Sequence, residues 1–600
     1  MKGKVIFTTA LCLSAMTPMM AQNITGKVVD TKGEPLAFAN VVLLNSTDSA
    51  FVKGAVSGED GSFVLDSSCN GGIIKVTSVG YKTVCKDCDS ENIGIIKMEE
   101  DSETLGEVVV KSSLPKTILK NGGMTTIVAG SILEKAGTME HLLDRIPKVS
   151  AQNGSIEVFG RGEPVIYING RQMRSRSELD RLQSDNIKSV EVITNPGASY
   201  AASTRAVIRI TTKKVQGEGF GFDASTTGEY DEKKNFCGFG QLNMSYRKNG
   251  LDLGAYAFGA KQYQPNNQDL QQKTYLDKTW NQKSENRQVG MVEAINFRLD
   301  ASYQLDANNS IGANFGFLRN PKQTCDANMT TAIWQDDEQT ESSDSHANSF
   351  EQKTTLSSNI YYVGKLGKLG IDFNTDWLWS KNNEDVVTKE QYQEVGMDAQ
   401  SQTVHSLTDK KYRLLASRLV LSYPLLGGEL SLGGEYSNTH RTSKYQVVPT
   451  NFVSDDYSRI TESMASSFLA YSRDFGNVSM EAGLRYEYID FNYYEYGKYV
   501  PEQSKSYGNW FPSISLSMPV GKVQMQLSYA TDIDRPPYYY LRSGIQYDNR
   551  YTYETGNPFL VSEISKNLNY ELAYKWLIFD MTYSHTSHTM MSNVETYKDN

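Results

Sequence analysis

Hydrophobic and polar residues alternate with a period of two over most of the chain from residue 215 onward. In one clear example, apolar residues take every second position, and polar or small residues take the positions between them. The apolar set is Val478, Met480, Ala482, Leu484, Tyr486 and Tyr488, and the other set is Ser479, Glu481, Gly483, Arg485 and Glu487. Because successive side chains of a β-strand point to opposite faces, the pattern predicts strands with one apolar and one polar face. Arg485 and Glu487 would then face a polar interior, and the apolar set would face lipid.

The connections between these stretches alternate in length. Short turn sequences stand at residues 248–250, 306–309, 427–428, 476–477 and 521–522, whereas the segment from Asn320 to Gln352 is long and polar. Transmembrane barrels have short periplasmic turns and long outer loops, so the spacing predicts a transmembrane antiparallel β-barrel over residues 215–600. A water-soluble sandwich also alternates, but the loop lengths and the aromatic residues at strand ends favour the barrel.

The first 21 residues have the features of a secretory signal peptide. Lys2 and Lys4 precede an apolar run from Val5 to Met16, which is too short to span a bilayer as a helix. The expected cleavage point is the bond between Ala21 and Gln22. No later run of about 18 apolar residues occurs, so we expect no transmembrane helix in the mature chain.

Residues 22–99 predict a small antiparallel β-sandwich, because short alternating stretches are separated by turn sequences at regular spacing. The string from Gly26 through Asp30, Gly33 and Pro35 to Val41 resembles the carboxypeptidase-regulatory-like domain. The resemblance concerns the fold, and no peptidase residues are recognised. We expect Val28, Val41, Leu43 and Phe63 to fill the core.

Cys85 and Cys88 form a Cys-x-x-Cys pair in this unit. A zinc site would need two further ligands nearby, and Cys69 is the one candidate. We therefore expect a local disulfide or an inert thiol pair, and no metal site.

Residues 111–214 predict a second unit of mixed α and β structure. Helical spacing covers residues 131–145 and 177–182, and strand-like runs cover residues 156–159, 165–168 and 187–193. Short elements occur in this unit in a fixed order: Ile146 and Pro147; Gly160, Arg161 and Gly162; residues 165–170, ending in Asn169 and Gly170; residues 189–193, with Glu191; Asn195 and Pro196; and residues 207–212. This order resembles the plug domain of TonB-dependent receptors, which implies that the unit fills the barrel lumen.

Two strings depart from the usual plug pattern. Thr194–Asn195 stands before Pro196 where Lys-Gly is usual, and Thr204–Arg205–Ala206 stands where Gly-Gly or Asn-Gly is usual. The departures indicate a subfamily and leave active transport open. A plugged barrel has about 22 strands, whereas about fifteen are counted here, so we expect the barrel to be incomplete at its C-terminus.

The linker of residues 100–110 contains three consecutive valines. The segment is Leu105, Gly106, Glu107, Val108, Val109 and Val110. It is either the first strand of the next domain or a TonB box, which would bind its partner by adding a strand to the edge of the partner's sheet.

Composition and motifs exclude several functions. The formal net charge of −10 argues against nucleic acid as a partner. No nucleophile elbow, phosphate loop or zinc spacing occurs, so we expect neither enzyme activity nor a cofactor. Two clusters remain: an acidic run (Asp336, Asp337, Glu338, Glu341, Asp344) and a tyrosine cluster (Tyr538, Tyr539, Tyr540, Tyr547, Tyr551, Tyr553). We interpret the first as a solvated loop rather than a calcium site, and the second as loop packing or an interfacial girdle rather than a sugar platform.

The resemblance implies a receptor of the cell outer membrane that imports a ligand by energised movement of the plug. Its expected partners are a TonB-type energy transducer in the periplasm, outer-membrane lipid and a surface lipoprotein. A siderophore, a glycan and a peptide are all compatible ligands, and the sequence does not choose among them. The alternative is a structural or adhesive outer-membrane barrel that keeps the plug but transports nothing.

Overall fold

The structure is a computed structural model. It describes residues 23–46, 50–69, 71–78, 80–101, 114–120, 122–152, 154–173, 176–180, 182–213, 218–230, 236–275, 277–450, 452–575 and 577–595. The expected signal peptide and residues 105–110 lie outside these ranges. The chain forms two compact units, residues 1–111 and 112–600.

The first unit is a β-sandwich. One sheet has the order β4-β1-β7 and the other has the order β3-β2-β5-β6. The strands are β1 (Asn23–Asp30), β2 (Asn40–Leu44), β3 (Phe51–Val56), β4 (Ser62–Asp66), β5 (Ile73–Thr77), β6 (Val84–Asp87) and β7 (Asn92–Met98). Val28, Val41, Leu43 and Phe63 are buried in its core, as expected. The expectation of a purely antiparallel unit is wrong, because β1 and β7 pair in parallel.

Neither expected arrangement of Cys85 and Cys88, a local disulfide between them or an inert thiol pair, is found. Cys88 forms a disulfide with Cys69, with 5.6 Å between their Cα atoms, and Cys85 is a free, exposed thiol. Cys88 is buried just beyond β6, next to the core, while Cys85 points outward from that strand. The Cys-x-x-Cys spacing therefore does not make a two-cysteine site here.

The plug occupies residues 114–213 of the second unit, and its sheet has the order β13-β12-β15-β14-β9-β8. Its strands are β8 (Thr117–Lys120), β9 (Gly123–Ile127), β12 (Val165–Ile168), β13 (Arg171–Gln172), β14 (Ile187–Ile193) and β15 (Val207–Thr212), with a separate hairpin of β10 (Val149–Gln152) and β11 (Ser155–Val158). The prediction of a single helix over residues 131–145 is wrong. The segment forms a 3-10 turn (Ile132–Lys135) and a separate helix α1 (Met139–Leu143), because Gly137 between them has a φ of 85°. The second expected helix is α2 (Arg176–Asp180).

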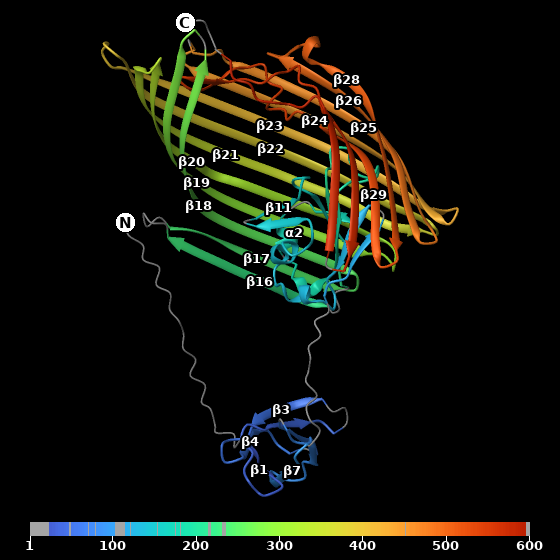
Figure 1. Cartoon of the computed structure of the whole chain (residues 1–600). Helices are drawn as coiled ribbons and strands as arrows, with labels where there is room; N and C mark the ends of the chain where they lie inside the picture. Colours follow the sequence, from blue (N-terminus) through green and yellow to red (C-terminus); the bar gives the residue numbers. More distant parts are fainter. Residues whose placement is uncertain are drawn as a thin grey trace, which may run out of the picture. The chain divides into compact units, whose positions relative to one another are not determined.

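The barrel sheet follows the chain strand by strand, and neighbouring strands are antiparallel (Figure 1). Its strands are β16 (Gly219–Tyr230), β17 (Phe236–Lys248), β18 (Leu251–Tyr275), β19 (Thr279–Gln304), β20 (Ser310–Gln335), β21 (Glu338–Leu366), β22 (Leu369–Glu394), β23 (Gln400–Leu425), β24 (Gly428–Val448), β25 (Asp456–Phe475), β26 (Val478–Glu495), β27 (Lys498–Tyr499), β28 (Lys505–Val520), β29 (Val523–Asp534), β32 (Glu563–Tyr574) and β33 (Leu577–Ser587). Within the described residues, the end strands β16 and β33 pair only with β17 and β32, so the sheet does not close on itself there.

The alternation of side chains is confirmed. In β26, Leu484 and Tyr488 are exposed on the outer face, whereas Arg485 and Glu487 are buried on the inner face. The long outer loop expected from Asn320 to Gln352 is wrong. Those residues continue β20 and β21, and the connection is the two-residue turn Asp336–Asp337, where both residues have positive φ. No helix in the described ranges is both long and apolar enough to cross a bilayer.

Candidate functional site

The plug motif Gly160–Arg161–Gly162 forms a tight turn against the barrel wall. Both glycines have positive φ, 72° and 77°, a conformation that most other residues avoid. The turn directs the buried Arg161 side chain toward Asn195, to which it donates a hydrogen bond, and toward Asp532 of β29, at 3.7 Å. Burial lowers the pKa of the Arg161 guanidinium, and the Asp532 carboxylate opposes that shift. Two predicted motif residues, Arg161 and Asn195, thus meet at one point of the wall.

The departures from the usual plug pattern also contact the wall. Asn195 donates to Ser528 Oγ of β29, at 3.1 Å. Thr194 donates to Glu571 Oε1 of β32, at 3.0 Å. Arg205 pairs with Asp534 at 2.9 Å. Three of the five departing positions, Thr194, Asn195 and Arg205, therefore add a polar contact between the plug and the sheet.

Lysines extend this contact surface. Lys148 lies 2.5 Å from Glu571 Oε1 and also pairs with Asp580 of β33. Lys120 in β8 pairs with Asp474 of β25, at 2.9 Å. Plug cations thus face wall carboxylates along β25, β29, β32 and β33. At β19 the charges are exchanged: the cation, Arg298, belongs to the wall and pairs at 2.8 Å with the buried carboxylate of Glu178 in α2 of the plug.

The remaining predicted motif residues shape the plug itself. Asn169 and Gly170, with φ of 51° and 82°, make the turn between β12 and β13. The Asn169 side chain accepts a hydrogen bond from the Thr212 backbone N–H at 2.9 Å. Glu191 pairs with Arg209 within the plug sheet, at 3.2 Å. Pro196 lines a small pocket at the boundary between plug and wall, together with Arg485 of β26 and Phe511 of β28.

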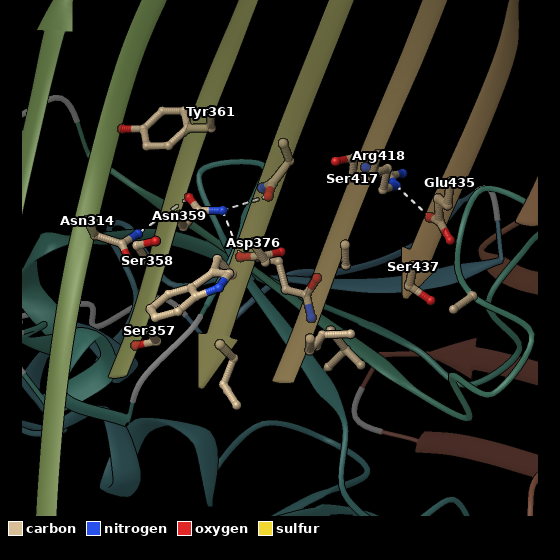
Figure 2. Close-up of a pocket in the computed structure, with 18 of the residues that line it drawn as sticks. Asn314, Ser357, Ser358, Asn359, Tyr361, Asp376, Ser417, Arg418, Glu435 and Ser437 are labelled. Carbon is tan, nitrogen blue, oxygen red and sulfur yellow. Dashed lines mark hydrogen bonds and ion pairs between the residues drawn. The ribbon is translucent and has the colours of Figure 1, made fainter. Parts of the chain in front are cut away.

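A cavity of about 570 Å³ lies between the plug and the inner face of strands β19–β25. Plug residues Tyr167, Gly170, Tyr200 and Thr204 form one side of it. Asn359 lies at the centre of the opposite side (Figure 2). It donates hydrogen bonds to Asn374 Oδ1 at 2.6 Å and to Asp376 Oδ1 at 2.8 Å, and accepts one from Asn314 at 3.4 Å.

Arg418 continues this polar wall. It pairs with Glu435 at 2.9 Å and with Asp372 at 3.4 Å, and donates to the Ser199 carbonyl of the plug at 3.0 Å. Figure 2 shows Arg418 and Glu435 on neighbouring strands of the cavity wall. A surface of amides, hydroxyls and charged groups can bind a ligand that offers many hydrogen-bonding groups.

A strap of residues 535–562 connects β29 to β32 and packs on the inner face of the sheet. Its small hairpin consists of β30 (Gln546–Asn549) and β31 (Thr552–Glu554). Tyr547 is buried among Val404, Tyr445 and Val447, and Leu541 is buried among residues of β25 and β26. At its far end, Arg550 Nε and Tyr551 Oη each lie 2.8 Å from Glu341 Oε1 of β21. The strap therefore reaches strands that lie far from its own in the sheet.

The strap explains both sequence clusters. The loop-packing interpretation fits Tyr547, which is buried, and Tyr551, which contacts Glu341. The acidic run is not one loop, because only Asp336 and Asp337 form a turn and Glu341 is a partner of the strap. No group of metal-binding side chains occurs among the residues that the structure describes. Sequence reasoning missed the cavity and the strap contacts, because their residues come from distant strands.

Two family models match the chain. Residues 24–110 match the CarboxypepD_reg-like domain, and residues 362–600 match the outer membrane protein beta-barrel family. TonB-dependent receptor SusC of Bacteroides thetaiotaomicron is 29% identical over 245 residues. That alignment covers 36% of this chain and 24% of SusC, so it spans about a quarter of that receptor's length.

Solved structures give a more distant likeness. The ferric enterobactin receptor PfeA of Pseudomonas aeruginosa has a TM-score of 0.43 and 15% identity, covering 79% of this chain and 72% of PfeA. The siderophore receptor PirA of the same organism has a TM-score of 0.43 and 14% identity, covering 78% of this chain and 75% of PirA. The matches thus place an outer membrane protein beta-barrel family domain at residues 362–600 and a CarboxypepD_reg-like domain at residues 24–110, in a protein of the cell outer membrane that is similar over part of its length to a TonB-dependent receptor.

Proposed function

We propose that this protein imports a ligand across the outer membrane by TonB-driven movement of its plug. The observation that carries the proposal is the cavity of about 570 Å³ between the plug and strands β19–β25, whose wall includes the hydrogen-bonding side chains of Asn359 and Arg418. A ligand held there contacts both the plug and the wall, so a shift of the plug changes the contacts that hold the ligand.

Residues 105–110 are the proposed TonB box. They precede β8, which is the edge strand of the plug sheet and contacts the wall. The Leu119 backbone N–H donates to Gln524 Oε1 at 2.6 Å, and the Gly122 N–H donates to Gln526 Oε1 at 3.1 Å. A pull on the box would reach β8 first, because the strand follows it directly in the chain. Because β8 is an edge strand of only four residues, separating it from β9 breaks few hydrogen bonds and costs little free energy.

The test is growth of a deletion strain on a panel of iron sources, glycans and peptides. The strain is complemented with the wild type, with a variant lacking residues 105–110, and with a matched variant in which residues 100–104 are replaced by a Gly/Ser sequence of equal length. We expect one nutrient to require the gene and residues 105–110 but to tolerate the linker replacement. Growth that needs the gene but not residues 105–110 would contradict TonB-driven import.

A structural or adhesive role is the second candidate. Thr194, Asn195 and Arg205 stand where the plug pattern departs from the usual one, and each binds the wall. These contacts favour a plug that stays in place. If the deletion strain grows normally on every nutrient of the panel and yet loses cell adhesion or envelope integrity, that result would replace import with this second function.

A further inference from the structure

A small cavity of about 20 Å³ lies where the strap meets the inner face of strands β23–β26. A cavity needs about 10–15 Å³ to accept one water, so this one accepts a single small species. Its walls carry three cationic side chains: Lys410 of β23, Arg441 of β24 and Arg542 of the strap. The other polar residues around it are Ser443, Asp456, Ser458, Tyr493, Tyr538, Tyr539 and Gln546.

The strand register brings the two wall cations together. Lys410 is opposite Ser443, and Tyr412 is opposite Arg441, so Lys410 and Arg441 are diagonal neighbours on the same face. Arg542 comes from the strap above them and is only 8% exposed. Like charges at this spacing repel one another, and the desolvation cost is added fully for the buried Arg542 and in part for Lys410 and Arg441, which are half-buried.

The three cations have too few acceptors. Within the described part of the chain, Lys410 and Arg441 form neither an ion pair nor a hydrogen bond, and Arg441 has only the Tyr538 ring, 5.6 Å from its Cζ. Arg542 donates to Gln546 at 2.8 Å and pairs with the half-exposed Glu554 at 3.4 Å. Its Nε is buried and has no partner. Lysine and arginine are donors only, so they cannot satisfy one another.

The neighbouring acids do not fill this gap. Asp456 is the carboxylate that lines the cavity, and it interacts with Arg542 and Ser458. Glu462 accepts a hydrogen bond from Tyr538 Oη at 3.0 Å. Glu384 faces Lys410 from β22, but the two groups do not form an ion pair. Three cations therefore share one lining carboxylate.

We propose that this cavity binds a monoatomic anion of the halide class, which joins the strap to the wall. An anion accepts hydrogen bonds from several donors at once and compensates the buried positive charge. A water molecule has two acceptor positions and no charge, so it leaves the repulsion in place. Since the anion contacts residues of both parts, it binds the docked strap more tightly than the free strap and stabilises docking. This inference does not depend on import.

The first test uses crystals of the full chain soaked in sodium bromide, with anomalous diffraction at the bromine edge. We expect a bromide peak within hydrogen-bond distance of Lys410 Nζ, the Arg441 guanidinium and Arg542 Nε. The Lys410→Gln/Arg441→Gln double variant should lose the peak. The matched control, Lys411→Gln, should keep it, because Lys411 is the exposed next residue of β23 and points to the other face. Water density without an anomalous signal would overturn the proposal.

The second test measures hydrogen exchange of residues 538–551 in chloride and in gluconate at equal ionic strength. Gluconate is too large for the cavity. Protection scales as 1 + [L]/Kd, so exchange should be about tenfold slower when chloride is at ten times its Kd. The Lys410→Gln/Arg441→Gln double variant should exchange at the same rate in both salts. Equal rates for the wild type in the two salts would contradict an anion that holds the strap.

Discussion

Arg161 of the plug and Asp532 of strand β29 form an ion pair across the boundary between plug and wall, with 3.7 Å between Nη1 and Oδ2. Their side chains are only 8% and 14% exposed. Removing one partner of a buried pair costs about 3–5 kcal/mol, because the other charge stays buried. We expect Arg161→Gln to loosen the plug by about 3 kcal/mol, measured by hydrogen exchange of strands β12, β14 and β15.

An exposed pair at the same interface is the matched control. Lys120 and Asp474 lie 2.9 Å apart, but their side chains are 50% and 54% exposed. Exposed pairs contribute only about 0–1 kcal/mol. Lys120→Gln should therefore change plug exchange little. Similar losses for Arg161→Gln and Lys120→Gln would mean that burial does not set the strength of plug docking.

A second buried charge depends on Lys148. Its ammonium group contacts both Glu571, which is almost fully buried, and Asp580. Lys148→Met should increase exchange of the plug by an amount that corresponds to about 3 kcal/mol or more. Adding Glu571→Gln should recover at least half of this loss, since the amide oxygen can still accept from Thr194. A double variant less stable than Lys148→Met alone would refute this assignment.

The cavity predicts different effects for two neighbouring residues of β21. Asn359 is buried on the inner face, whereas Ile360 is 56% exposed on the outer face. Asn359→Trp should fill the cavity and remove the hydrogen bonds to Asn374 and Asp376, so we expect uptake of the identified ligand to fall at least about tenfold, the equivalent of about 1.4 kcal/mol. Ile360→Trp should leave uptake unchanged at equal surface expression. Equal uptake by both variants would exclude this cavity from the import path.

The strap should depend on Glu341. This carboxylate accepts from both Arg550 Nε and Tyr551 Oη at 2.8 Å. Hydrogen bonds to charged groups contribute about 1.5–3 kcal/mol each, so Glu341→Gln should raise the hydrogen exchange of residues 546–554 at least about tenfold. Glu338→Gln, at the exposed start of the same strand, is the control and should have no effect. Unchanged exchange in Glu341→Gln would show that the apolar contacts alone hold the strap.

Glu134 predicts one component of the plug's pH dependence. Its pKa is lowered from 4.5, first by the hydrogen bond from Lys213 and then by the backbone N–H of Gly130. A carboxyl with a lowered folded pKa contributes stability above its unfolded pKa, and this is lost as the pH falls through the folded pKa. The urea concentration at the unfolding midpoint of the plug should therefore decrease as the pH is lowered below about 4.5. In Glu134→Gln the midpoint should depend less steeply on pH over the same range. An identical slope in the variant would contradict the assignment.

Local patterns were enough to predict the faces of the strands and the core of the first unit. The alternation around Arg485 predicts which side chains point inward, and the core positions of the sandwich follow from the same period. Turn chemistry is equally local, since an Asn-Gly pair favours a tight hairpin turn and Asn169 and Gly170 both have positive φ. These features depend on residues close together in sequence, where the physical constraint is short-ranged.

Contacts between distant residues could not be predicted in this way. The pairing of Thr194 with Glu571 joins positions 377 residues apart. Cys88 bonds Cys69 rather than its close neighbour Cys85, because the fold and not the spacing decides which thiols meet. The polar stretch from Asn320 to Gln352 was mistaken for a loop, since a strand beyond the membrane has no apolar face.

That extension of β20 and β21 has a consequence for how the protein can vary. A membrane crossing takes about 9–11 residues of a strand, whereas β21 has 29 residues. Most of this strand is therefore ordered backbone outside the bilayer, and its conformational entropy, about 1–2 kcal/mol per residue, is already lost before any encounter. Side chains still alternate between the inner and outer faces there, so neighbouring residues of β21 lie on two different surfaces. A change at one position alters what the interior binds, and a change at the next alters only what approaches from outside.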